Sequence, residues 1–239
     1  MITSFKNLIK KALFYKPLPE TKAIREAIEA VSTGGMPYCP ASEGDMLFSL
    51  IEENVSKSCL EIGFYTGSTA LYLAKAIKNR GGQVTSICLD DDESVARGLS
   101  LLDREGVADQ HQLIRKNSNL ALPELILSGA NFDFIFMDGW KTFDHVVFEI
   151  YLVNQMLEQG GIIAFDDAYM PSIRKVISLL KQYYGYQEID YRDHNQTIRL
   201  RLFHILSRKS LHRPYRALKK IHATNDQAAF QDWNFHRQL

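Results

Sequence analysis

The stretch "CLEIGFYTGSTALYLAKAI", residues 59–77, decides the fold because its periodicity changes within a few residues. Its first part is an apolar run that ends in Glu61, which is typical of a buried β-strand. Its last part has apolar residues at helical spacing. Gly63 and Gly67 lie between the two parts, so the stretch predicts a strand, a tight turn and a helix, in that order.

The same alternation continues to residue 183. Apolar segments typical of strands occupy 83–90, 111–117, 132–138 and 161–167, and helical patterns occupy 93–106, 120–129, 144–161 and 171–183. Such alternation predicts a parallel sheet with helices on both faces, because each crossover is right-handed and covers the sheet. Segments 186–193 and 196–206 alternate with period two and predict an antiparallel hairpin. We therefore predict an α/β fold: a doubly wound, mostly parallel, seven-stranded, Rossmann-like sheet with an antiparallel C-terminal hairpin.

The chain divides into three predicted segments. Residues 1–40 are an N-terminal helical extension or lid, residues 41–206 are the alternating domain, and residues 207–239 are a basic C-terminal tail. Residues 207–222 of the tail carry six Lys or Arg residues without an acid, together with apolar residues at helical spacing. This pattern predicts an amphipathic basic helix.

Composition excludes several classes of protein. Lys+Arg and Asp+Glu balance at 28 each, which argues against a dedicated nucleic-acid binder. The cysteines Cys39, Cys59 and Cys88 are odd in number and well separated, so we expect no disulfide framework and a reduced, cytoplasmic compartment. No apolar run approaches the roughly 18 residues of a spanning helix, and the lysines of the first turns interrupt any signal-peptide pattern.

The ends of the predicted strands are the places to search for chemistry, because ligands of open parallel sheets bind there. In chain order these ends are Glu61–Gly63, Asp90, 117–119, 138–141 and 166–167. The first turn lacks the second glycine of the dinucleotide motif G-x-G-x-x-G. Glu61 would also repel a pyrophosphate, so this turn favours a ligand with a cationic amino or sulfonium group.

Asp90 ends the second predicted strand. An acid at this place can accept hydrogen bonds from both hydroxyls of a ribose. The alternative interpretation is a turn or helix cap, since acids also occupy positions 91–93 and favour a helix N-terminus.

Four stretches in order resemble a known family: "LEIGFYTGSTALYLA", Asp90, "FDFIFMDGWK" and "GGIIAFDD". They are similar to class I S-adenosylmethionine-dependent methyltransferases, and more narrowly to the metal-dependent catechol and caffeoyl-CoA O-methyltransferases. The resemblance covers about residues 40–206. It implies an enzyme that methylates a hydroxyl of a small molecule with S-adenosylmethionine and a divalent cation.

The resemblance also implies roles for individual residues. The expected cofactor contacts are Glu61, Gly63, Tyr65, Gly67 and Thr69 around the methionine part, Asp90 at the ribose, Ser118, Asn119 and Trp140 around the adenine, and Asp138 beside them. Lys141 falls where the family keeps a lysine that assists deprotonation of the acceptor hydroxyl, so the expected catalytic residues are Lys141 and Asp138. A substrate-binding or ion-pairing lysine is the alternative.

The remaining implied group is the metal. Its expected ligands are Asp138, Asp166 and Asp167, an all-oxygen set that suits Mg²⁺, Mn²⁺ or Ca²⁺. The family usually has Asn at the position of Asp167, so a third carboxylate changes the charge of this site. Alternatively, Asp166 and Asp167 cap the helix that opens at Pro171.

Three functions therefore stay open. The first is metal-assisted O-methylation of a small molecule; the second is metal-independent O- or N-methylation of a sugar or natural-product intermediate; the third is cofactor binding without catalysis. The expected partners are a small-molecule acceptor and a second copy of the chain in a homodimer, and no nucleic acid. His145 is interpreted as a cap or packing residue, outside the catalytic set.

Overall fold

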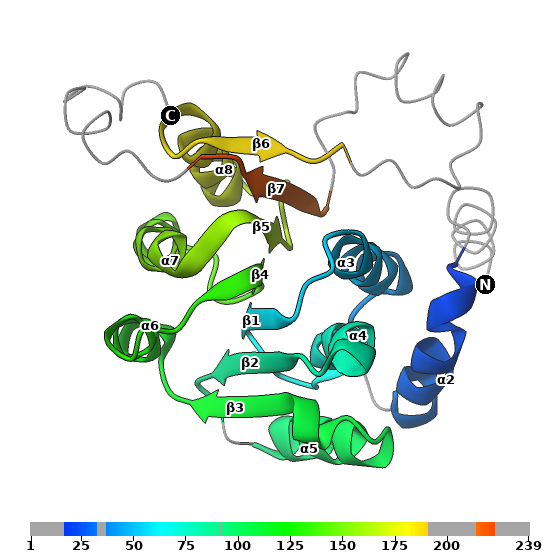
Figure 1. The fold of residues 1–239 in the computed structure, drawn as a ribbon. Helices are drawn as coiled ribbons and strands as arrows, with labels where there is room; N and C mark the ends of the chain where they lie inside the picture. Colours follow the sequence, from blue (N-terminus) through cyan, green and yellow to red (C-terminus); the bar gives the residue numbers. More distant parts are fainter. Residues whose placement is uncertain (1–16, 33–36, 91, 191–213, 223–239) are drawn as a thin grey trace, which may run out of the picture.

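The computed structural model describes residues 17–32, 37–90, 92–190 and 214–222, which form one seven-stranded sheet covered by helices on both faces (Figure 1). The strands are β1 (Ser58–Ile62), β2 (Gln83–Cys88), β3 (His111–Arg115), β4 (Phe132–Met137), β5 (Leu157–Phe165), β6 (Tyr186–Glu188) and β7 (Arg216–Lys220). The α-helices are α2 (Lys22–Val31), α3 (Ala41–Glu53), α4 (Ser68–Ile77), α5 (Glu93–Arg104), α6 (Ser118–Leu127), α7 (Phe143–Met156) and α8 (Pro171–Tyr183), and the 3₁₀ helices are η1 (Pro19–Thr21), η2 (Lys78–Arg80) and η3 (Ala108–Gln110).

The strand order is β3-β2-β1-β4-β5-β7-β6. Strands β1 to β5 pair in parallel, whereas β7 pairs antiparallel with both β5 and β6. This arrangement confirms the predicted doubly wound, mostly parallel sheet with antiparallel C-terminal strands. The order reverses between β1 and β4, and this switch point is where open α/β sheets bind their ligands.

Strands β1 to β5 and β7 contribute side chains to two separate cores. In β4, Phe134 and Phe136 face the core under α2, α3, α4 and α5, while Ile135 and Met137 face the core under α6, α7 and α8. All four side chains are at most 3% exposed. Burial on both faces explains why the strands read as continuous apolar runs.

The last strand corrects one prediction. Arg216–Lys220 form β7, so the expectation of a basic helix is wrong for these residues; residues 207–213 and 223–239 of the expected tail lie outside the described part. Ala217 and Leu218 point into opposite cores, as neighbours in a strand do. Pairing with β5 therefore outweighs the helical spacing of the apolar residues. The second expected hairpin segment, 196–206, also lies outside the described residues.

The end of α7 differs from its predicted position. The helix stops at Met156 and β5 begins at Leu157, where we predicted a helix through residue 161. Lys220 of β7 is only 6% exposed, and its Nζ donates to the carbonyl oxygens of Asn154 (2.6 Å) and Leu157 (2.8 Å). A cation at a helix C-terminus satisfies carbonyls that have no partner within the helix. This lysine thus helps to end α7.

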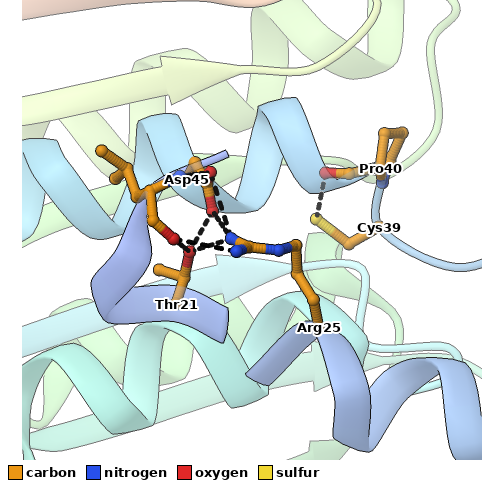
Figure 2. Close-up of polar contacts among 6 residues, drawn as sticks. Thr21, Arg25, Cys39, Pro40 and Asp45 are labelled. Atoms are coloured by element: carbon orange, nitrogen blue, oxygen red, sulfur yellow. Dashed lines mark hydrogen bonds and ion pairs between the residues drawn. The ribbon is translucent and has the colours of Figure 1, made fainter. Parts of the chain in front are cut away.

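A buried polar network attaches α2 and η1 to α3 (Figure 2). The Asp45 carboxylate of α3 accepts hydrogen bonds from the Leu18 amide (2.7 Å) and the Thr21 hydroxyl, and it pairs with Arg25 at 3.1 Å. Asp45 is 2% exposed. A buried charge with several donors holds its helix firmly, because removing one partner leaves the others unsatisfied.

Among the residues that the structure describes, no helix is both long and apolar enough to cross a lipid bilayer.

Gly98 of α5 offers a test of how the first turn is supported. A Cβ at this position would lie 2.8 Å from Phe64 Cε1 and the Thr66 carbonyl carbon, and 2.9 Å from the Gly67 amide nitrogen. Because two of these contacts are backbone, we expect Gly98→Ala to destabilise the protein by about 1–3 kcal/mol despite alanine's better helix propensity. Urea unfolding would measure the loss. Ser100→Ala, exposed on the same helix, is the control, and equal stability of both variants would contradict the prediction.

Candidate active site

A cavity of about 480 Å³ opens at the carboxyl ends of β1, β2, β3 and β4. Six of the residues predicted to bind the cofactor line it: Gly63, Tyr65, Asp90, Ser118, Asp138 and Trp140. The other lining residues were not predicted as cofactor contacts: Ile62, Phe64, Ile87, Cys88, Leu89, Lys116, Asn117, Gly139 and His145. Most of the unpredicted ones flank a predicted residue in the chain, so their positions follow from the same strand ends.

The turn after β1 brings its backbone close to the turn after β4. Gly63 has φ of 103°, and a Cβ there would lie 2.4 Å from the carbonyl oxygen of Asp138. Gly67 has φ of 67° and no room for a Cβ beside Gly98. Tyr65 adopts a positive φ of 40° as well. This turn therefore requires its glycines, and its residues Gly63 and Tyr65 line the cavity.

Glu61 lies beneath this turn and is fully buried. Ser86 donates a hydrogen bond of 2.5 Å to its Oε2, whereas its Oε1 is buried without a hydrogen-bond partner. Burial raises the pKa of Glu61 to about 8, although the Ser86 hydroxyl opposes the shift. An unsatisfied carboxylate oxygen below a cavity is suited to a ligand that brings a hydrogen-bond donor.

His111 supports Glu61 from β3. Its Nε2 lies 2.9 Å from the Ser86 oxygen, and because that hydroxyl already donates to Glu61, the histidine is the donor in this contact. Burial lowers the pKa of His111 to about 4, so the ring is neutral near pH 7. The ring also stacks on Phe64 with centroids 5.0 Å apart.

The far side of the cavity is built from α6 and α7. His145 Nε2 lies 3.2 Å from Ser118 Oγ and 3.1 Å from Glu149 Oε1, and burial raises the pKa of Glu149. The structure thus brings His145 into the cavity wall, where the sequence predicted only a cap or packing residue. The i, i+4 spacing of His145 and Glu149 was a signal for this contact.

Three acids meet one lysine at the ends of β4 and β5. Lys141 Nζ lies 2.9 Å from Asp138 Oδ1 and 3.9 Å from both Asp166 Oδ2 and Asp167 Oδ2. Burial raises the pKa of Asp138 to about 7; Asp166 adds to this shift and Lys141 opposes it. Ser172 donates a hydrogen bond of 2.7 Å to the Lys141 carbonyl, which ties the lysine's loop to α8. The structure therefore brings together all four residues that we predicted for catalysis and metal binding.

The described side chains, as arranged here, do not form a binding site for the expected metal. Within the described part of the chain, no three His, Cys, Asp or Glu side chains are disposed so that they could hold a metal ion. The Lys141 ammonium is instead the cation that the three carboxylates share. As arranged, these residues do not fit a divalent ion.

Besides the buried Glu61, three predicted cofactor contacts do not line the cavity: Gly67, Thr69 and Asn119. Thr69 is 8% exposed in the first turn of α4, and Asn119 has a buried Oδ1 without a hydrogen-bond partner. Trp140 lines the cavity and is 69% exposed, so it is not an ordinary core residue. The sequence did not predict one buried acid, Glu43 of α3, which is 4% exposed. Burial and the charges of Asp166 and Asp138 raise its pKa.

A second cavity, of about 640 Å³, runs along α8 and contains Arg174, Lys175, Lys181 and Arg216. It is larger than the first, but two of its four cations are already paired with Glu188. None of the acidic strand ends lines it. The smaller cavity, at the topological switch point, is therefore the candidate active site.

Comparison with known proteins finds a similarity to a methyltransferase domain over the same residues. A family described as "Methyltransferase domain" matches residues 60–168, from β1 to the loop after β5. This range contains the turn after β1, Asp90 and the three clustered acids. It does not contain α3 or β7.

Curated relatives point to one group of methyltransferases. A caffeoyl-CoA O-methyltransferase of Populus kitakamiensis is 33% identical over 153 residues, which are 62% of this chain and 63% of that protein. One of Stellaria longipes is 27% identical over 163 residues, 67% of this chain and 66% of that protein. The chain thus spans somewhat less than two thirds of the length of these relatives.

Solved structures share the fold. The O-methyltransferase TomG of Streptomyces achromogenes, solved with S-adenosylmethionine, has a TM-score of 0.63 and 17% identity, covering 90% of this chain and 95% of that one. An O-methyltransferase of Bacillus cereus, solved with S-adenosylhomocysteine, has a TM-score of 0.61 and 17% identity, covering 79% and 91%.

Glu61 makes the stability of the unliganded protein depend on pH. Its pKa rises from 4.5 to about 8 on folding, so folding takes up a proton between these values. The resulting stabilisation is complete below pH 4.5 and is lost as the pH rises towards 8, by up to about 1.4 kcal/mol per pH unit. We expect Glu61→Gln, which cannot ionise, to flatten this decline in urea unfolding between pH 5 and 8. Glu53→Gln, exposed on α3, should keep the wild-type slope; parallel slopes for all three proteins would refute the assignment.

Proposed function

We propose that the chain, whose residues 60–168 match a family described as a methyltransferase domain, transfers the methyl group of S-adenosylmethionine to a hydroxyl of a small molecule. The observation that carries the proposal is the cluster of Asp138 and Lys141 at the edge of the candidate cofactor cavity. Relatives and structural neighbours named as O-methyltransferases support it.

The cavity has the features that this cofactor requires. The unpartnered Oε1 of Glu61 would accept a hydrogen bond from the cofactor's amino group, and Gly63 lets the ligand approach the backbone. Asp90 lines the cavity at the end of β2, where an acid accepts hydrogen bonds from ribose hydroxyls. Ser118 and Trp140 would then flank the adenine. The roles of these residues are part of the proposal.

Asp138 and Lys141 would have separate roles in activating the acceptor hydroxyl. The bound cofactor supplies a methyl group, whose bond to sulfur breaks as its bond to the acceptor oxygen forms. Asp138 would take the hydroxyl proton, since a base with a pKa of about 7 is matched to neutral pH. The Lys141 ammonium orients Asp138 at 2.9 Å and would stabilise the developing oxyanion. Both residues lie in the loop after β4, which the hydrogen bond from Ser172 ties to α8.

Metal assistance is the alternative mechanism for the same reaction, and the sequence predicts Asp138, Asp166 and Asp167 as the ligands of the divalent cation. The side chains as arranged do not form a metal site, so no step is assigned to a metal here. Location in the cytoplasm and assembly into a homodimer likewise stay predictions from the sequence.

The proposed reaction is tested by calorimetry and by turnover. We expect the full chain to bind S-adenosylmethionine and to release S-adenosylhomocysteine with at least one member of a panel of phenols, catechols and sugars. Lys141→Met should lower kcat by about 100-fold or more, because it removes the oxyanion partner and the cation that orients Asp138, and leave cofactor affinity within about twofold, because Lys141 does not line the cofactor cavity. Lys22→Met, on the exposed face of α2, is the matched control. If no cofactor bound at millimolar concentration, the proposed function would fail.

The two candidate mechanisms give opposite results with a chelator. Because the Lys141 ammonium already lies among the three carboxylates, we expect the enzyme to keep at least about half of its turnover after dialysis against EDTA. Metal analysis of the dialysed protein is the control for complete removal. Loss of turnover that Mg²⁺ or Mn²⁺ restores would replace the lysine-centred mechanism by the metal-assisted one.

A further inference from the structure

The cavity along α8 is a second hollow that the proposed reaction does not use. Its volume of about 640 Å³ is in the range of pockets that bind small molecules. It lies between one face of α8 and the start of β7, which are neighbours at the edge of the sheet (Figure 1). Half of its lining residues are cations, and the part of its wall that the structure describes contains no acid.

The helical spacing of α8 gathers polar side chains over this cavity. Arg174, Ser178 and Lys181 follow one another at intervals of four and three residues, so they share one face of the helix. Lys175 and Gln182 lie seven residues apart and border the same face. Cations collected on one face repel one another, whereas cations spread around a helix do so less. An anion in the cavity would offset this repulsion.

The amino end of α8 adds to the positive charge. Pro171, the first residue of the helix, lines the cavity, and the first turn contains no acid. Such a helix end favours anions, because its free N–H groups and the helix dipole are positive there. Arg174 and Lys175 follow directly. Within the part of the chain that the structure describes, neither of these side chains is paired with a carboxylate, although Lys175 Nζ lies 5.3 Å from the centre of the Phe143 ring.

Glu188 of β6 holds the other two cations in position. Its carboxylate accepts two hydrogen bonds of 2.7 Å from Arg216 Nε and Nη2, and one of 3.1 Å from Lys181 Nζ. Glu188 itself does not line the cavity, so it supports these cations from behind. Side chains that are already held in place lose little further freedom when a ligand binds. One carboxylate also cannot neutralise two cations, so positive charge remains on the cavity side.

The cavity begins beside the catalytic cluster without being part of it. Arg216 pairs with Phe165, the last residue of β5, and Asp166 follows directly. Ser172, in the first turn of α8, donates its hydrogen bond of 2.7 Å to the Lys141 carbonyl. The amino end of α8 and the start of β7 therefore lie at the same edge of the sheet as the cluster. The two cavities share no lining residue among those described, so a ligand along α8 would leave the cofactor cavity free.

The donors in this cavity match a phosphate group better than a carboxylate. A phosphate carries about two negative charges and three strong acceptor oxygens, so it can engage several cations at once. The guanidinium groups of Arg174 and Arg216 can each donate two parallel hydrogen bonds to it, and the lysines act as point charges. The Ser178 hydroxyl and the Gln182 amide add neutral donors. The volume exceeds that of one phosphate, so the ligand has further atoms.

We propose that the cavity along α8 binds the phosphate group of a small molecule, with Arg174, Lys175, Lys181 and Arg216 as its cationic contacts. The inference goes beyond the proposed function, because this site is separate from the cofactor cavity and binding there needs no methyl transfer. The phosphate belongs either to the methyl acceptor or to a separate molecule. The same side chains recognise it in both cases.

Titration of the full chain with inorganic pyrophosphate tests the site. In amide NMR spectra near pH 7, with S-adenosylhomocysteine present to fill the cofactor cavity, we expect saturable shifts concentrated in α8 and β7. The double variant Arg174→Gln/Lys175→Gln should weaken binding at least about tenfold, because it removes the two cations without an acid partner. Both positions are exposed, so the variant should fold. The control, Lys22→Gln/Arg97→Gln, loses the same charge from exposed positions of α2 and α5, on the opposite face of the sheet, and should keep the wild-type affinity within about twofold.

Three results would overturn the proposal. The first is the absence of saturable binding to the wild type, and the second is an affinity that the α8 double variant keeps within twofold. The third is equal weakening by the two double variants, since pyrophosphate would then respond only to the overall charge of the protein. None of these measurements requires turnover, so they decide the anion site even if the proposed methyl transfer fails.

Inhibition of turnover identifies the source of the phosphate. Pyrophosphate that competes with the methyl acceptor in the wild type, but not in the α8 double variant, would assign the phosphate group to the acceptor. Binding of pyrophosphate without such competition would assign it to a separate molecule. If the wild type released no S-adenosylhomocysteine with any acceptor, the proposed function would fail, and the NMR titration would still stand.

Discussion

The register of the parallel strands around β1 and β4 is the constraint on which the site depends. Ile62 pairs with Met137 and Met137 pairs with Phe165, so the next residue of each strand emerges at the same edge. The ladder continues one step further, because the Asp166 amide donates to the Met137 carbonyl at 3.2 Å. A slip of one residue would turn every side chain to the opposite face and separate the acids. The catalytic cluster is thus a consequence of how the apolar strands pair.

Local patterns were sufficient to predict most of the sheet edge. Gly63, Asp90 and Asp138 follow apolar runs directly, and a parallel sheet gathers the carboxyl ends of its strands whatever their order. The sequence could not predict β7, because the spacing of the apolar residues around Leu218 fits a helix as well as a strand. Only the pairing with β5 decides between them. The early end of α7 depends on Lys220, which lies more than sixty residues away in the chain. Long-range contacts, which no local pattern contains, account for these differences.

Glu43 was missed for a related reason. In the sequence it is an acid in the first turn of a helix, which is an ordinary and favourable place for a negative charge. The packing of α3 against α4 buries it, as the contact of Gly44 with the Tyr72 ring shows. Burial then leaves one of its carboxyl oxygens without a hydrogen-bond partner. No local pattern in the sequence indicates this packing.

The balance of charge connects these features. Asp138, Asp166 and Asp167 lie 2.9–3.9 Å from one ammonium, that of Lys141, so this cluster holds more acids than that lysine can pair. Burial, together with neighbouring acids, raises the pKa of Asp138 to about 7 and that of Glu43 to about 9, so both groups can hold a proton near neutrality. Positive charge that enters with a ligand competes with those protons. In the proposed reaction the sulfonium of the cofactor would supply such a charge, next to the hydroxyl to be methylated.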